Sequence, residues 1–346
     1  MPKFNLSMTP AEAAKNILKK LPTKRMRDVI EKRFGLKGPG PATLDGIGKE
    51  YKITRERVRQ IEADALKHLG KENNLAEIKT VLAGLEEYLK DYGEVMAEHH
   101  LFGTAAEAKY HPHLSLLLYL GKNFHKTKEN DNFHSCWTTT PASAEKSERV
   151  VKAVMDELEK SKKTVSKEGL HNLFDKHIKN ILGQALPETR EAHLAMCKVI
   201  NSNPYGEYGL AHWPVITPRG IRDKAYLALA KASKAMHFLD IAKTINKAGW
   251  SGKKAHPQTV HNELIKDERF VLVGRGLYAL QEWGYEPGVV REVLVSVLKK
   301  AGKPLSKDEL VKTVTEKRFV KAPTILLNLQ NKSLFKRSED GKYTLA

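Results

Sequence analysis

The stretch 43-TLDGIGKEYKITRERVRQIEADALKHL-69 contains two helical patterns separated by a short turn at Lys52 and Ile53. Thr43 and Thr54 precede the two patterns, and a threonine hydroxyl at such a position caps a helix by accepting a first-turn amide. Apolar side chains then recur every three or four residues, which gives each helix one inward face. They are Leu44, Ile47, Tyr51, Val58, Ile61, Ala65 and Leu69. The stretch therefore predicts a helix-turn-helix.

The outward face of the second predicted helix carries Arg55, Glu56, Arg59 and Gln60 on its first two turns. The N-terminal turns of a recognition helix enter the major groove of DNA. Arginine can fork onto guanine, glutamate accepts from the cytosine amino group, and glutamine pairs with adenine. Taken alone, such a run is also compatible with an ordinary solvated helix face.

The sequence of the whole stretch resembles region 4.2 of the sigma-70 family of bacterial RNA polymerase sigma factors, with its Thr-Leu start, glycine, turn and TRERxRQIEAxAL. The resemblance implies that the four outward residues read a promoter −35 element and that Arg57 contacts a phosphate. Thr43 and Thr54 are included among the DNA-binding candidates. The preceding LPTKRMRDVIEKRFGL, residues 21–36, resembles region 4.1, which implies docking on the polymerase flap.

The resemblance ends there. A complete sigma factor also carries region 2, whose aromatic-rich helix captures and melts the −10 element, and the sequence contains no such segment. The region 4-like stretch also stands near the N-terminus, whereas it normally ends a sigma factor. We therefore expect binding to double-stranded, promoter-like DNA together with bacterial RNA polymerase, without promoter melting.

Composition indicates a globular protein of several small domains, with 346 residues of which 41% are hydrophobic. The sequence has no run of eighteen apolar residues, and MPKFNLSMTP at its start lacks the apolar core of a signal peptide. Cys136 and Cys197 are far apart and form no C-x-x-C motif, which is typical of a reducing compartment. We expect a cytoplasmic, nucleoid-associated protein that does not contact membranes.

The net charge of +18 is concentrated at the two ends of the chain. Residues 1–72 hold 17 lysines and arginines against 9 acidic residues, and residues 218–346 hold 25 against 13. Residues 73–217 hold 17 against 19. This split predicts that the ends contact phosphates while the middle acts as a spacer or meets protein. The alternative is that lysine-rich ends only increase solubility.

Beyond residue 72 the sequence repeats a plan of three helices followed by a two-stranded ribbon. The first copy is expected to have helices at 75–89, 93–101 and 112–120 and strands at 122–125 and 132–138. The predicted fold class is mainly α, with a helix-turn-helix domain and tandem winged-helix domains that carry small β-hairpin wings. Its expected domains are 1–72, 73–142, 143–217, 218–286 and 287–346.

The fourth of these domains contains FLDIAKTINKAGW at 238–250 and TVHNELIKDERFVLVGRGLYAL at 259–280. These segments resemble the HARE-HTH winged helix, a module similar to one in the RNA polymerase delta subunit. If the helix at 257–267 reads DNA, its outward candidates are Gln258, His261, Asn262 and Lys266. Arg275, between Gly274 and Gly276, is expected at the tip of a wing. A wing that binds protein is the alternative.

Two further classes of site were considered. Seven metal-ligand side chains, six histidines and Cys136, fall between residues 99 and 136, but none has the spacing of a zinc finger. No nucleophile elbow, catalytic triad or paired-carboxylate motif occurs. We therefore expect no metal, no cofactor and no enzymatic activity.

The sequence thus predicts a sequence-specific DNA-binding transcription protein. One alternative is a delta-like polymerase-associated subunit whose surfaces bind protein and whose charge gives only loose nucleic-acid affinity. A DNA-modification accessory protein without its own active site is another.

Overall fold

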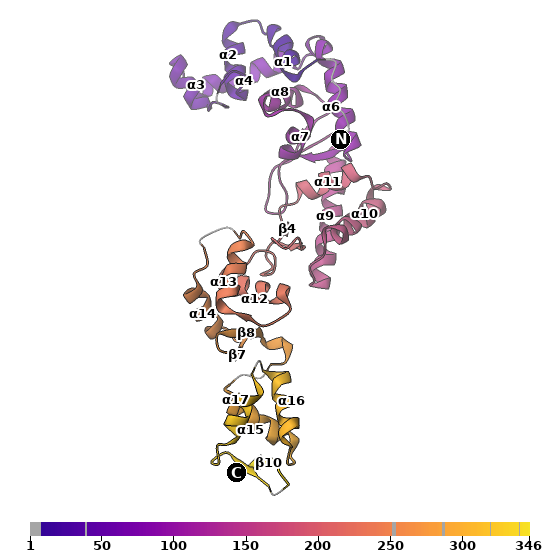
Figure 1. The fold of residues 1–346 in the computed structure, drawn as a ribbon. Helices are drawn as coiled ribbons and strands as arrows, with labels where there is room; N and C mark the ends of the chain where they lie inside the picture. The colour runs from indigo at the N-terminus through magenta and orange to yellow at the C-terminus, as the bar shows by residue number, and fades with distance from the viewer. Residues whose placement is uncertain (1–7, 39, 251–253, 286–287, 319, 339) are drawn as a thin grey trace. The chain divides into compact units, whose positions relative to one another are not determined.

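The computed structural model describes residues 8–38, 40–250, 254–285, 288–318, 320–338 and 340–346. The chain divides into two compact units. The first comprises residues 1–201 and 208–211, and the second comprises 202–207 and 212–346. The architecture is mainly α with small antiparallel β hairpins, consistent with helix-turn-helix and winged-helix folds (Figure 1).

The first unit begins with four capped helices: α1 (Pro10–Lys19), α2 (Lys24–Phe34), α3 (Leu44–Tyr51) and α4 (Arg55–Leu69). Thr9 and Glu12 form a capping box at α1, as the sequence predicts. Helix α2 ends at Gly35, whose φ of 70° is the left-handed conformation that glycine adopts readily. The predicted chain break at Gly38–Pro41 includes Pro39, which lies outside the described residues.

The turn between α3 and α4 depends on Gly48 and Lys52. The amide of Ile53 donates to the Gly48 carbonyl at 2.9 Å, and Lys52 adopts a left-handed φ of 52°. A Cβ atom on Gly48 would lie 2.8 Å from the Ile53 carbonyl oxygen, closer than real contacts of this kind. The absence of a side chain at this position therefore lets the turn close against α3.

Helix α4 contributes to two hydrophobic cores of the first unit. Val58 and Ile61 pack with Val29 of α2 and Ile47 of α3 in a small core. Ala65 and Leu69 join a larger core that also receives α1, α6 and α8. Burial of these four positions in α4, with relative exposures of 7% or less, confirms the predicted inward face.

The part of the chain after α4 differs from the sequence prediction at two places. The predicted helix 75–89 is α5 (Glu72–Leu75), the 3-10 turn η1 (Ala76–Ile78) and α6 (Lys79–Asp91). The predicted helix 93–101 is instead strand β1 (Val95–Ala97) followed by α7 (Glu98–Ala105). Gly93 and Glu94 have left-handed φ angles of 84° and 67°, which interrupt any helix before β1.

Strand β1 belongs to a three-stranded antiparallel sheet in the order β1-β3-β2, with β2 at His125–Lys126 and β3 at Cys136–Thr138. Val95 pairs with Thr138, and Ala97 with Cys136. The expected strands 122–125 and 132–138 were therefore too long and, for β2, displaced. Between β1 and β2 lie α7, the 3-10 turn η2 (Ala108–Tyr110) and α8 (His111–Leu120).

A second set of elements follows the same order. The sequence predicts that this set starts with the segment 147–161, but helix α9 (Pro141–Ser161) begins earlier, because Thr140 caps it. Val165 pairs with Tyr208 as a single bridge before α10 (Lys167–Leu182) and α11 (Pro187–Met196). Strands β4 (Ile200–Ser202) and β5 (Tyr208–Leu210) then form a hairpin.

The second unit contains two further sets with this order of helix, strand, two helices and two strands. The first is α12 (Ile221–Ala232), β6 (Met236–His237), α13 (Phe238–Lys247), α14 (Pro257–Lys266), β7 (Phe270–Gly274) and β8 (Leu277–Leu280), followed by η3 (Gln281–Trp283). Its sheet order is β6-β8-β7. The sequence predicts helices at 223–235, 238–248 and 257–267 and strands at 270–273 and 277–280. These agree with the structure within about three residues at each end, and β6 is not predicted.

The last set is α15 (Val290–Ala301), a bridge from Leu305 to Tyr343, α16 (Lys307–Lys317), α17 (Ala322–Leu329), β9 (Phe335–Arg337) and β10 (Tyr343–Leu345). Its predicted elements agree, and Glu339 in the predicted Ser338–Gly341 turn lies outside the described residues. We refer below to the four sets, in chain order, as the first to fourth repeats.

The Gly48 contact generates a test of the turn. We expect Gly48→Ala to destabilise α3 and α4 by about 1 to 3 kcal/mol, because the added methyl group overpacks the turn. Hydrogen exchange of the α3 and α4 amides in the full chain measures the loss of protection.

Gly103→Ala is the matched control, since a Cβ there meets nothing within 4 Å and Gly103 also lies inside a helix. That change should slow exchange in α7 by the equivalent of about 0.5 to 1 kcal/mol. Unchanged protection of α3 and α4 in Gly48→Ala would contradict the proposed role of the close contact.

Candidate nucleic-acid interface

The N-terminus of α4 is organised by Thr54. Its hydroxyl accepts the Arg57 amide at 3.2 Å, and Thr43 caps α3 in the same way by accepting the Gly46 amide at 3.0 Å. Both predicted caps are confirmed. Because each hydroxyl already serves its own helix, a direct contact of Thr43 or Thr54 with DNA stays a prediction.

All five polar residues predicted on the first turns of α4 are exposed: Arg55, Glu56, Arg57, Arg59 and Gln60. Arg59 donates hydrogen bonds to both carboxylate oxygens of Glu56, from Nε to Oε2 at 2.9 Å and from Nη2 to Oε1 at 2.7 Å. Arg57 donates from Nη1 to Oε1 of Gln60 at 3.0 Å. Arg55 forms no hydrogen bond or ion pair with another described residue. Among the described residues, the face thus has one guanidinium group without a partner, that of Arg55, and two side-chain pairs.

The pairing of Glu56 with Arg59 shifts the pKa of both side chains. The hydrogen bonds from Arg59 lower the pKa of the Glu56 carboxyl, and the same bonds raise the pKa of Arg59. The two side chains are 59% and 60% exposed, so water screens their attraction and the pair can open at little cost. A base edge can therefore compete for either partner.

The cations beside this face differ in their availability. Lys49 forms an ion pair with Asp45 at 2.9 Å within α3. Lys32 forms an ion pair with Glu50 and lies over the ring of Tyr51. Lys52, in the turn, is exposed and pairs with no other described residue. Sequence reasoning placed Lys52 in the turn but did not single it out, although its position before α4 suits a phosphate contact.

The predicted second surface on α14 is only partly open. Gln258, Asn262 and Lys266 are exposed, and Gln258 donates to Asn262 at 3.3 Å. His261 is half-buried, with its ring 4.7 Å from the Phe238 ring centre and 5.8 Å from that of Tyr278. Its role is thus at least partly packing, which the sequence pattern could not distinguish.

Arg275 lies exposed in the turn between β7 and β8. Only one of its flanking glycines, Gly276, has a left-handed φ, of 68°. The expectation that both glycines supply unusual backbone angles is therefore wrong for Gly274, which instead lies where the β7 register shifts. The predicted exposed cation at the hairpin turn is confirmed.

The corresponding third helices of the other repeats have different surfaces. Helix α8 buries five of its leucines and exposes Tyr119. In α11, Arg190 is tied to Asp175 at 2.7 Å. Helix α17 has no charged residue, and its Leu327 is 67% exposed. Among the third helices of the described repeats, α14 has the side chains best suited to base edges.

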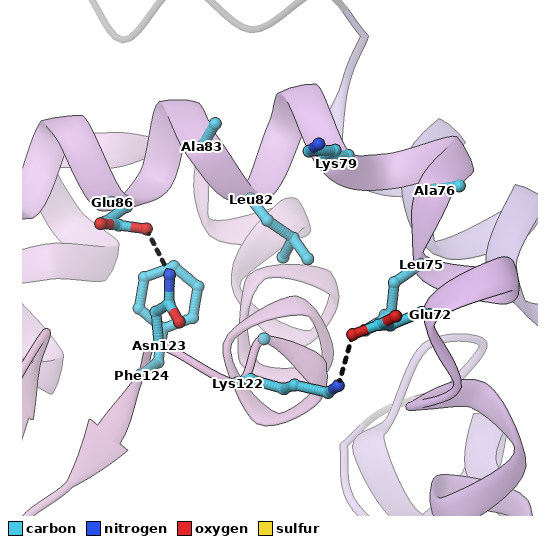
Figure 2. Close-up of a pocket in the computed structure, with 11 residues that line it drawn as sticks. Glu72, Leu75, Ala76, Lys79, Leu82, Ala83, Glu86, Lys122, Asn123 and Phe124 are labelled. Carbon is cyan, nitrogen blue, oxygen red and sulfur yellow. Dashed lines mark hydrogen bonds and ion pairs between the residues drawn. The ribbon is translucent and has the colours of Figure 1, made fainter.

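A hollow in the first unit is lined by residues outside α3 and α4 (Figure 2). It is a groove of about 600 Å³ between the α5–α6 segment and residues 121–124, with Leu75, Leu82 and Phe124 among its apolar walls. An ion pair from Lys122 to Glu72 and a hydrogen bond from Asn123 to Glu86 cross it at two points. Nothing in its lining has the character of a catalytic site.

The predicted absence of a metal site was examined among the described residues. No group of three or more His, Cys, Asp or Glu side chains within them could hold a metal ion. The rings of His99 and His134 do meet edge to face, with their centres 4.8 Å apart, but among the described residues no third ligand lies there. Both cysteines are buried, and burial raises the pKa of the Cys136 thiol to about 12. None of the described helices is long and apolar enough to cross a membrane.

Comparison with known proteins identifies one region of the chain. Residues 17–71 match the family described as Sigma-70, region 4. The RNA polymerase sigma factor SigA of Lactococcus lactis subsp. cremoris and that of subsp. lactis strain IL1403 are each 51% identical over 47 residues. That match covers 14% of this chain and only 13% and 12% of those two proteins.

Proposed function

We propose, from the sigma-70 region 4 domain at residues 17–71, that the chain is a sequence-specific DNA-binding transcription protein. In this proposal α4 reads a promoter −35-type element in the major groove. The observation that carries it is the joint placement of Arg55, Glu56, Arg59 and Gln60 on the exposed first turns of a helix within the matched region.

The chemistry of these side chains supports direct readout. Arg55 and Arg59 each offer a planar fork that suits the O6 and N7 acceptors of guanine. Glu56 suits the amino group of cytosine and Gln60 suits adenine. Opening of the Glu56–Arg59 pair lets each partner meet its own base, while Arg57 and Lys52 are placed to neutralise phosphates.

The wider proposal concerns partners. We infer that bacterial RNA polymerase binds the chain through the region 4.1-like helix α2 and that the protein acts in the cytoplasm at the nucleoid, without enzymatic activity or promoter melting. We also propose that residues 73–142, 143–217, 218–286 and 287–346 are winged-helix domains, the third of them HARE-HTH-like. The repeated order of helix, strand, two helices and two strands supports this reading.

Arg59 provides the direct test of readout. We expect Arg59→Ala to weaken binding to the cognate duplex by about 1 to 3 kcal/mol and to relax specificity at one base pair, because a bidentate contact is lost. Fluorescence anisotropy against the cognate duplex and its single-base variants measures both effects.

Lys67→Ala is the matched control, because Lys67 is also exposed but lies on the last turn of α4, about 12 Å along the axis from Arg59. It should leave the base preference unchanged. Equal effects of the two substitutions on specificity would rule out Arg59 as a base reader.

Helix α14 is proposed as a second DNA contact, through Gln258, Asn262, Lys266 and Arg275. Its exposed amides and its cation are what distinguish it from α8, α11 and α17. We expect footprinting of the full chain on a long duplex to show two protected segments, one of which Asn262→Ala combined with Lys266→Ala removes. A footprint that this double variant leaves intact would assign α14 to another role.

The alternative, a polymerase-associated subunit with loose nucleic-acid affinity, is favoured by one observation. The near-neutral middle of the chain presents third helices α8 and α11 that lack free base-reading side chains, so these repeats suit protein contacts better. Measuring DNA affinity at increasing salt concentration distinguishes the two functions. A binding protein of the alternative kind loses affinity for all sequences equally, whereas a specific reader keeps its preference.

A further inference from the structure

The fourth repeat is strongly basic but is built differently from a base reader. Residues 288–346 hold 13 lysines and arginines against 6 acidic residues. Yet α17, its third helix, has no charged side chain, and its Leu327 is 67% exposed. The charge of this repeat therefore lies on other elements.

Part of this charge lies on the β9–β10 hairpin. Lys336 and Arg337 belong to β9, and Lys342 directly precedes β10. The register pairs Arg337 with Tyr343 and Lys336 with Thr344, so the three cations lie within one short ribbon. The Arg337 guanidinium is 5.9 Å from the centre of the Tyr343 ring. All three side chains are exposed.

A fourth cation, Lys303, lies near the hairpin. Leu305 pairs with Tyr343 through two backbone hydrogen bonds, with N to O distances of 3.1 and 2.8 Å. This pairing brings the residues near 303 alongside the hairpin. Both Lys303 and Lys342 act on the carboxylate of Glu309, whose pKa is lowered chiefly by its hydrogen bonds to Ser306. That carboxylate is engaged in the capping box of α16.

Lys303, Lys336, Arg337 and Lys342 form no ion pair with another described residue. Other exposed lysines, such as Lys90, Lys122 and Lys176 in the first unit, are each paired with a glutamate. Unpaired like charges held on one ribbon repel each other and favour a polyanion that releases counterions when it binds.

We infer that the hairpin of the fourth repeat is a sequence-independent phosphate-binding surface for duplex DNA, formed by Lys336, Arg337 and Lys342 with Lys303 beside them. It supplies charge without base contacts, because the one side-chain amide of α17, that of Asn328, is half-buried and donates to the Thr324 carbonyl of the same helix. Beside the contacts proposed for α4 and α14 it is a third attachment to DNA, and such linkage raises overall affinity without new base contacts. The inference rests on the proposed function only in taking duplex DNA as the polyanion.

The test is the salt dependence of binding to a duplex of unrelated sequence. Each phosphate contact contributes about 0.9 to the slope of log K against log salt. We expect the full-length Lys336→Ala, Arg337→Ala, Lys342→Ala variant to have a slope smaller by about 2 to 3, with its preference for cognate over unrelated DNA unchanged. Anisotropy titrations at several salt concentrations measure the slope.

Two comparisons make the result specific. Lys146→Ala, Lys160→Ala, Lys163→Ala removes three exposed, unpaired lysines from the near-neutral second repeat and should leave the slope as in the wild type. Lys336→Arg, Arg337→Lys, Lys342→Arg keeps the charge and should also retain it, which separates charge from folding.

An unchanged slope in the alanine variant would overturn the inference, as would an equal fall in the control from the second repeat. Either result leaves the reading of bases by α4 untouched. Failure of the proposed function appears separately, as a wild-type protein that shows no preference between cognate and unrelated duplexes.

Discussion

The orientation of the exposed face of α4 depends on the burial of the helix in two hydrophobic cores. Its N-terminal half is held by Val58 and Ile61 against α2 and α3, and its C-terminal half by Ala65 and Leu69 against α1, α6 and α8. Because both halves are anchored, the outward face of the first turns has a fixed direction relative to the first repeat. The turn at Gly48 completes this arrangement by letting α3 approach the start of α4.

The repeats share an order of elements but differ in chemistry on equivalent helices. The third helix is buried and leucine-rich in α8, tied by an ion pair in α11, amide-bearing in α14 and uncharged in α17. The last hairpin again carries exposed cations that form no ion pair with the residues that the structure describes. The architecture therefore permits the parts of the chain to differ in function, with α4 and α14 contacting bases, the last hairpin binding phosphates, and the first and second repeats acting as spacers or binding protein.

Long helices and their caps could be predicted because the information is local. The hydroxyl of Thr54 and the three-to-four spacing of Val58 to Leu69 lie within α4 itself. The short strands could not be predicted in this way, because β1 forms by pairing with β3, which lies some forty residues later in the sequence. For the candidate site, the exposure of the polar face followed from periodicity. The pairing of Glu56 with Arg59 and the packing of His261 on Phe238 depend on side-chain geometry that the pattern does not contain.

The central claim is that α4 reads a base sequence, and selection from a randomised duplex library tests it most directly. The full chain and its Glu56→Ala, Arg59→Ala variant are selected in parallel at near-physiological salt. The claim predicts that the wild type enriches a motif resembling a −35 hexamer and that the variant loses it. A wild type that enriches no motif, and that behaves as the variant does, would contradict the claim.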